Sequence, residues 1–391
     1  MSGAPASVSA AEDRITVVAA DDSHAAALAV FFREAWGTEG TAAGVREARA
    51  RAAVENPVDP GVHPPTFLVL KGERVIGYCT SLPNRLWDGR TERGAYWAKG
   101  LMVLPEFRNG PIGFMVLKAL TRAFRIGTSV TVAPASKRLF GSLGYTDFGA
   151  MPNFLLPLDV GAIASRLDVS LLGLGRLPTW APGVLAMAQR TGLARLGGTL
   201  AGAMFGAAVA VRGRTRFAVE LDATPSEDDL DALWQRCRAE LGGAPVRDAD
   251  YWTHRYARDH EGRRYRFAAV REQGTLVGLA VLREPSGDGD PRLRGVRVVS
   301  FSDALFMPSR EDVAIGVLTA ARRQARRMGA HALLCSASHR AFVGALRSQW
   351  YVPLAGTIHF LLRDTESGPG WPATLDAWWL TRGDGYSDDS F

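Results

Sequence analysis

The feature that most constrains the fold of this chain is that its two halves repeat one pattern. Residues 66–82, TFLVLKGERVIGYCTSL, and residues 265–283, YRFAAVREQGTLVGLAVLR, each indicate two strands joined by a short polar turn. Later in each half, residues 136–158 and 339–363 indicate a short helix followed by a strand. The offset of roughly 200 residues is far longer than the period of a solenoid repeat. The sequence therefore predicts two copies of one domain.

Strands alternate with helical segments in each copy, which predicts an α/β or α+β sheet with helices on its faces. A length of 391 residues also exceeds that of one typical domain. The predicted parts are an N-terminal domain over 14–158, a helical bridge over 159–214, a C-terminal domain over 215–365 and a tail over 366–391.

The composition is that of a soluble globular protein, with 47% hydrophobic and 22% charged residues. The net charge of +6 comes almost entirely from arginine, and the densest cluster, ARRQARR at 321–327, has the spacing of a solvated helix face. We therefore expect no nucleic-acid partner. The three cysteines are scattered and show no CxxC spacing, so neither a disulfide framework nor a metal site is predicted.

No targeting or membrane-spanning segment is predicted. Residues 1–14 lack the basic segment and apolar core of a signal peptide. The most apolar run, 196–211, has 16 residues, short of the ~18–20 that span a bilayer. We expect a buried or interdomain helix there, leave shallow membrane contact open, and predict a cytoplasmic protein.

A glycine-containing loop between a strand and a helix is the strongest functional signal. The apolar run 95–104 predicts a strand that Pro105 ends. Apolar residues then recur at helical spacing from Phe114 to Phe124, with Gly127 in the place of a C-terminal cap. The free backbone N–H groups at such a helix start, together with the helix dipole, form a site for an anion.

The stretch VLPEFRNGPIG (103–113) resembles the cofactor loop of the GNAT superfamily of N-acetyltransferases. Val103, Pro105, Arg108 and Gly113 match the loop pattern, whereas the middle glycine is displaced by one residue, to Gly110. The resemblance covers about residues 14–158, with a first helix over 23–36 and the late LFGSLGY signature at 139–145.

The resemblance implies a mixed, mostly antiparallel sheet in each domain and acetyl-CoA, or another acyl-CoA, as the cofactor, with no metal. By analogy, the backbone of one strand end holds the pantetheine arm, and the loop with the helix start holds the pyrophosphate. The first group is Leu101, Met102 and Val103; the second is Arg108, Asn109, Gly110, Pro111, Ile112, Gly113 and Phe114.

The second half carries the same skeleton without this loop. Residues 307–316, MPSREDVAIG, place Glu311 and Asp312 where glycine-rich backbone is expected. Two carboxylates there would repel a pyrophosphate. We therefore expect one cofactor site, in the N-terminal half, and a degenerate C-terminal copy.

The catalytic groups are less clear, because the usual tyrosine acid of the superfamily falls at Phe140. The remaining candidates are Glu34, Tyr78 and Tyr145. Each has a structural alternative: a solvated helix face for Glu34, a sheet face for Tyr78 and a packing role for Tyr145.

The leading hypothesis is an acyl-CoA-dependent N-acetyltransferase acting on a small or medium amine. A second hypothesis is an acyl-CoA-binding or sensing protein without catalysis, and a third is aminoacyl transfer from charged tRNA. The acceptor amine, the acyl chain length and the oligomeric state stay open.

Overall fold

A computed structural model describes residues 14–130, 133–166, 187–257, 264–285, 295–366 and 370–390. The chain divides into two compact units. Unit 1 comprises residues 1–86, 90–149 and 357–370, and unit 2 comprises residues 87–89, 150–356 and 371–391. Each unit is one sheet with helices on its faces, so the predicted α/β class is confirmed.

The sheet of unit 1 has the strand order β1-β2-β3-β4-β5-β15-β6. β1–β2, β2–β3 and β5–β15 are antiparallel, whereas β4 and β5 run parallel. The strands are β1 Ile15–Ala19, β2 Thr66–Lys71, β3 Arg74–Trp87, β4 Glu92–Val103, β5 Ile126–Ser129, β6 Thr146–Ala150 and β15 His359–Asp364. The predicted hairpin over 66–82 is the β2–β3 pair, and the predicted strand over 95–104 is the main part of β4.

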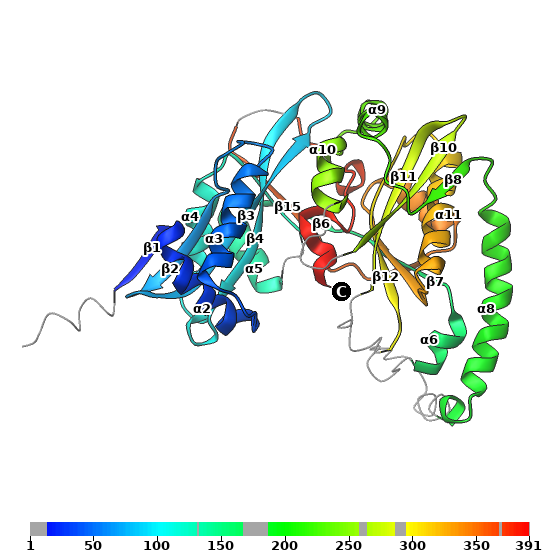
Figure 1. Cartoon of the computed structure of the whole chain (residues 1–391), viewed down its shortest axis with the longest axis horizontal. Helices are drawn as coiled ribbons and strands as arrows, with labels where there is room; N and C mark the ends of the chain where they lie inside the picture. The colour runs from blue at the N-terminus through cyan, green and yellow to red at the C-terminus, as the bar shows by residue number, and fades with distance from the viewer. Residues whose placement is uncertain are drawn as a thin grey trace, which may run out of the picture. The chain divides into compact units, whose positions relative to one another are not determined.

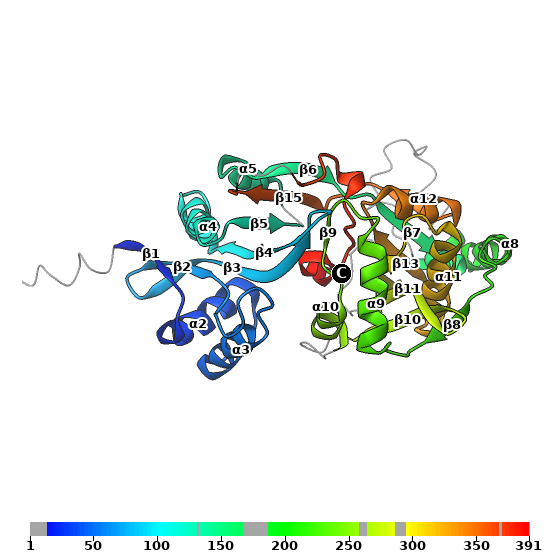
Figure 2. The ribbon, with the colours of Figure 1, turned by 90° about the horizontal axis from the view of Figure 1, so that it is seen from above.

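Helices cover both faces of this sheet (Figure 2). α2 and α3 lie on one side of β1, β2 and β3, and α4 lies on the other. Gly77 on β3 allows the second contact, because a Cβ there would lie 2.7 Å from Ile112 Cγ2 at the start of α4. The helical elements of unit 1 are η1 Asp22–His24, α2 Ala25–Trp36, α3 Ala42–Val54, η2 Pro105–Phe107, α4 Ile112–Arg122 and α5 Pro134–Ser142.

Unit 2 has a second sheet, in the order β14-β7-β13-β12-β11-β10-β8. The predicted hairpin over 265–283 is the antiparallel β10–β11 pair, and β12 and β13 are its parallel strands. The strands are β7 Asn153–Pro157, β8 Ala218–Leu221, β10 Tyr265–Glu272, β11 Thr275–Arg283, β12 Val298–Phe306, β13 Ala332–Ser336 and β14 Val352–Leu354; a short strand, β9, covers Ala244–Pro245.

In unit 2, one helix packs on the sheet at a glycine, as α4 does at Gly77 in unit 1. α9 and α11 lie on opposite faces of the sheet. Gly278 on β11 lies directly against α11, where any Cβ would clash with Val313 and Val317. The helical elements are α6 Val160–Arg166, α8 Leu193–Arg212, α9 Glu227–Arg238, α10 Ala249–Trp252, η4 Thr253–Ala257, α11 Glu311–Arg327, α12 Arg340–Ser348, η6 Leu375–Ala377 and η7 Asp384–Ser390.

Two strands lie in the unit opposite to the one that the sequence predicts. Residues 153–157 were predicted to end the N-terminal domain, but β7 pairs with β13 and β14 in unit 2. Residues 359–364 were predicted to end the C-terminal domain, but β15 pairs with β5 in unit 1. The units thus exchange their late strands, because local strand propensity does not specify the sheet that a strand joins.

The helix predicted within 196–211 exists as α8, but it is not buried. Over Leu193–Arg212 it is long and apolar enough to cross a membrane by length and composition, and most of its side chains are exposed. The expectation of a buried helix is therefore wrong. The physical reason is that only one face, with the small residues Ala194, Gly198 and Gly202, turns toward the rest of the unit.

His339 gives unit 2 a predicted pH dependence. Its ring is 5% exposed and lies 5.1 Å from the Trp379 ring, and its Nδ1 accepts a hydrogen bond from the Ala341 N–H at the start of α12. Burial lowers the pKa of His339 to about 4; Arg340 adds to this shift and Asp376 opposes it.

Because the unfolded chain binds more protons below a pH of about 6.5, stability should fall as the pH drops from there toward 4, by up to ~3 kcal/mol. Urea unfolding across this range measures the effect. His339→Asn keeps a capping side chain without a titrating group, so its profile should be flatter; an identical profile would contradict the assignment.

Candidate functional site

The predicted anion site lies where β4 ends and α4 begins. The amides of Arg108 and Gly110 bond to the carbonyls of Pro105 and Phe107, at 3.3 and 3.2 Å, which closes a compact turn. α4 then starts at Ile112, with Pro111 at the N-cap and no side-chain cap. Its first-turn N–H groups therefore have no partner within the helix and are available to an anion.

Close packing does not explain the two glycines of this loop. A Cβ on Gly113 would lie 3.5 Å from Leu139 Cδ1, and one on Gly110 would lie 3.5 Å from the Phe107 carbonyl, which are ordinary contacts. The packing of the protein therefore does not require glycine at either position, in contrast to Gly77. Close approach of a ligand to the backbone would explain glycine at these positions, and it stays a prediction.

Arg108 lies at the edge of the same loop. Its exposed side chain folds back, so that Nε donates to the Val103 carbonyl at 3.0 Å and Nη2 lies 3.7 Å from Met102 Sδ. The guanidinium thus covers the end of β4 beside the helix start. Contact of Arg108 with a phosphate stays a prediction.

β4 separates from β5 next to this loop. The two strands pair in parallel at Tyr96–Gly127 and Trp97–Thr128, whereas β4 continues to Val103 and β5 ends at Ser129. The half-buried Leu101, Met102 and Val103 lie beyond the part of β4 that pairs with β5. Their backbone has the extended geometry that pairs with a linear ligand.

Gly100 interrupts β4 just before these residues, and the sequence analysis missed it. Its φ is +66°, and a Cβ there would lie 3.1 Å from Tyr78 Cε1. A strand glycine with positive φ typically marks a bulge or a close approach, and bulges redirect backbone groups next to active sites. The isolated glycine within the apolar run 95–104 was the signal that could have found it.

Tyr78, a predicted catalytic residue, therefore lies beside the candidate cofactor strand. Its ring packs among Phe31, Phe32 and Trp36 of α2, with centroid distances of 5.3 to 6.0 Å. Burial raises the pKa of Tyr78 to about 12. The hydroxyl consequently stays protonated at neutral pH and can donate a hydrogen bond, although the raised pKa makes it a weaker proton donor.

The other two predicted catalytic residues lie elsewhere in unit 1. Arg74 Nη2 lies 2.9 Å from Glu34 and 2.9 Å from Glu106, so the Glu34 carboxylate is held in a surface ion pair near the loop. Tyr145 is buried beside Phe140, at a centroid distance of 4.8 Å, and its hydroxyl has no hydrogen-bond partner among the described residues. Burial raises the pKa of Tyr145.

The structure does not bring Glu34, Tyr78 and Tyr145 together. Tyr78 faces α2, whereas its neighbour Gly77 faces α4, as alternation along a strand requires. Tyr145 packs against α5, which contacts α4. The two tyrosines therefore pack on different faces of the sheet, and their catalytic roles stay predictions.

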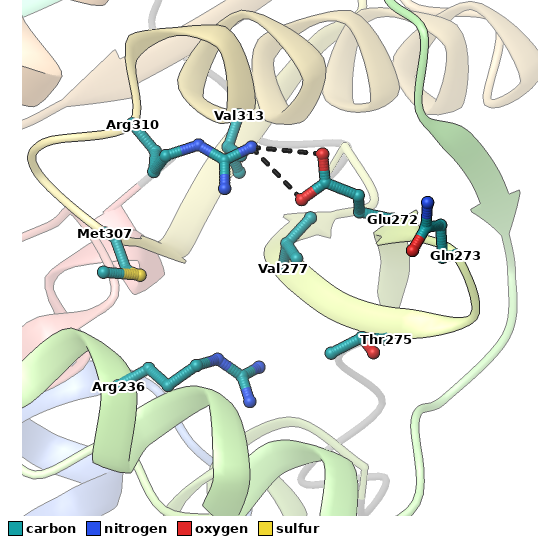
Figure 3. A pocket seen from close by; sticks show the side chains of 8 residues that line it. All are labelled: Arg236, Glu272, Gln273, Thr275, Val277, Met307, Arg310 and Val313. Carbon is teal, nitrogen blue, oxygen red and sulfur yellow. Dashed lines mark hydrogen bonds and ion pairs between the residues drawn. The ribbon is translucent and has the colours of Figure 1, made fainter.

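Unit 2 has a pocket of about 540 Å³ beside the start of α11, the helix that corresponds to α4 of unit 1 (Figure 3). Arg310 approaches Glu272 at 3.2 Å and Asp312 at 2.9 Å, and Arg216 approaches the same two carboxylates. Hydrogen bonding from Arg310 lowers the pKa of Asp312. Asp312 is therefore paired with arginines, whereas Glu311 is exposed, and the repulsion of a pyrophosphate here stays a prediction.

In unit 2, the C-terminal segment would block a cofactor arm from pairing with the sheet. β12 and β13 pair in parallel only up to Phe301 and Cys335. Beyond them, Ser338 N–H bonds to the Leu380 carbonyl at 3.1 Å, and Gly383 N–H bonds to the Ser302 carbonyl at 2.6 Å. Residues 380–383 thus occupy the space between the diverging strands, which corresponds to the space beside Leu101–Val103 in unit 1.

Solved structures that superpose on this chain identify its fold. A GCN5-related N-acetyltransferase from Anabaena variabilis superposes with a TM-score of 0.55 at 12% identity, over 90% of this chain and 73% of that one. The fold is that of the GCN5-related N-acetyltransferases. A second one, from Kribbella flavida, gives a TM-score of 0.52 at 16% identity, over 91% of this chain and 72% of that one.

An acyltransferase of another kind has the same fold. Saccharomyces cerevisiae N-myristoyltransferase with bound myristoyl-CoA gives a TM-score of 0.55 at 11% identity, over 89% of this chain and 82% of that one. No family model and no curated protein matches the sequence. The resemblance noted at residues 103–113 is thus confirmed at the level of the fold.

Proposed function

We propose that the protein is an acyl-CoA-dependent N-acyltransferase with its cofactor site in unit 1. The observation that carries this proposal is the uncapped start of α4, after a glycine loop, next to a strand end that pairs with no described residue on its β5 side. Anion binding and strand pairing are the two contacts that a pyrophosphate with a long amide-containing arm needs. The fold shared with acetyl- and myristoyltransferases supports the same reaction class.

Each part of an acyl-CoA would contact a different group of residues. The first-turn amides of α4 would bind the pyrophosphate, with the charge of Arg108 beside them. The backbone of Leu101, Met102 and Val103 would hold the arm. The bound acyl-CoA would supply an activated acyl group, and the Tyr78 hydroxyl, protonated at neutral pH, would donate a hydrogen bond toward the departing thiolate.

Calorimetric titration of acetyl-CoA and of a longer acyl-CoA into the full chain tests the site. We expect one equivalent per chain, and an affinity at least ~10-fold lower for Arg108→Glu, because a charge-assisted contact becomes a repulsion. Arg122→Glu is the matched control, since Arg122 is exposed at the other end of α4 and undergoes the same charge change. Equal losses in both variants, or no binding by the wild type, would contradict the proposal.

A binding protein without catalysis is the second candidate, and one observation favours it. Glu34 is held by Arg74, and Tyr145 is buried away from Tyr78, so only Tyr78 among the predicted catalytic groups lies beside the cofactor strand. Release of free CoA with a panel of amines separates the two candidates. Acyl-CoA binding without release of free CoA, with the same affinity in Tyr78→Phe, would favour the binding protein.

A further inference from the structure

The helix α8 of unit 2, whose position Figure 1 shows, exposes an apolar stripe. Its large hydrophobic side chains Leu193, Leu196, Leu200, Met204 and Val211 are between 61% and 77% exposed. They recur every three, four or seven residues, which places them on one narrow face of the helix. The stripe is about 27 Å long at the rise of an α-helix. An exposed apolar row of this length indicates an interaction surface.

The opposite face of α8 holds the helix on the folded unit. A Cβ on Gly198 would lie 2.8 Å from the Gly161 Cα of α6, and Val209 is buried in the core of unit 2. At the C-terminal end, Thr319 of α11 donates to the Gly213 carbonyl at 2.9 Å. Figures 1 and 2 both show α8 on the outer side of α11. The helix is therefore held against the unit by one face, and its stripe is available to a partner.

The chain around the stripe carries only positive charge. Residues 187–219, the described segment that contains α8, hold five arginines and no acidic residue, and one of the five, Arg216, is paired with Glu272 and Asp312. Arg190, three residues before α8, and Arg212, the last residue of α8, are both exposed, so positive charge lies at both ends of the stripe.

We propose that α8 docks the protein on an anionic lipid bilayer, with its stripe at the boundary between headgroups and acyl chains. A helix with an exposed apolar stripe, exposed arginines at its two ends and no acidic residue has the chemistry of such a surface. The helix lies in the plane of the interface rather than across it, because its other face is packed on the unit. A second copy of the chain fits less well, since a symmetric contact would bring the same arginines together.

Flotation of the full chain with vesicles tests the proposal. One set of vesicles contains equal parts of phosphatidylcholine and phosphatidylserine, and the other contains phosphatidylcholine alone. We expect binding to the anionic vesicles that weakens with added salt, and little binding to the neutral ones. The double variant Leu196→Ser, Leu200→Ser should bind at least ~10-fold more weakly, because it removes apolar area without changing charge.

Ala201→Ser with Ala210→Ser is the matched control. These alanines are exposed on α8 outside the stripe, and the same residue type is introduced. The control should bind within about twofold of the wild type, and circular dichroism should show both variants folded. Equal losses in the two pairs, absence of binding to anionic vesicles, or a dimer in solution that the leucine pair alone breaks would each overturn the proposal.

Discussion

Replacing Arg247 by methionine is expected to lower the free energy of unfolding by about 3–5 kcal/mol. Arg247 is 0% exposed; its Nε lies 3.0 Å from Asp303 and its Nη2 lies 2.9 Å from Asp384, and both carboxylates are buried. Arg247 also donates to the Pro245 and Trp379 carbonyls, at 3.1 and 3.3 Å. The variant would leave two carboxylates in the core of unit 2 without their counter-charge, which costs more than the lost hydrogen bonds.

Chemical denaturation of three variants measures this effect. Arg323→Met is the matched control, since Arg323 is an exposed arginine on α11, and its change should stay within about 0.5 kcal/mol. Arg247→Met combined with Asp303→Asn and Asp384→Asn should recover part of the loss, because no buried charge then lacks a partner. A loss below ~1 kcal/mol for Arg247→Met alone would mean that the cluster is solvated like a surface ion pair.

Local patterns predicted the two hairpins well, although they did not predict that a glycine in each hairpin contacts a helix. Gly77 and Gly278 stand at matching places in the two hairpins, and each lets a helix, α4 or α11, approach its sheet. Strand alternation and turn residues act over a few residues, so a single sequence reports them. The loop over 104–113 was found for the same reason, because a strand end, glycines and a helix start are local features.

Features that depend on distant pairing could not be predicted. Gly127 was predicted to cap a helix, but it lies within β5, where a Cβ would clash with Phe124 and Tyr145. The exchange of β7 and β15 depends on which strand edge each segment meets in the folded chain. The partners of Glu34 are likewise remote, since Arg74 is 40 residues away. Such contacts are set by tertiary packing, which overrides local propensity.

A chain that ends at Gly370 is expected to lose the cooperative unfolding of unit 2, while unit 1 keeps all of its own residues. Truncation removes Trp378 and Trp379, both 0% exposed, and the second ring packs between Phe306 and Phe342. Loss of a buried tryptophan side chain typically costs ~3–5 kcal/mol, and removal of Asp384 and Asp388 adds unpaired buried arginines. The sum approaches the whole stability of a typical domain, about 5–15 kcal/mol.

Limited proteolysis with mass spectrometry locates the loss, and near-ultraviolet circular dichroism follows the tryptophan environment. Cleavage should concentrate in residues 150–356, and a peptide of residues 371–391 added in trans should restore part of the protection, because residues 380–383 lie between β12 and β13. Unchanged melting of the truncated chain would show that the tail only covers the surface of unit 2. Protection restored by the peptide would instead show that the space between these strands needs an extended segment to fill it, whichever chain supplies that segment.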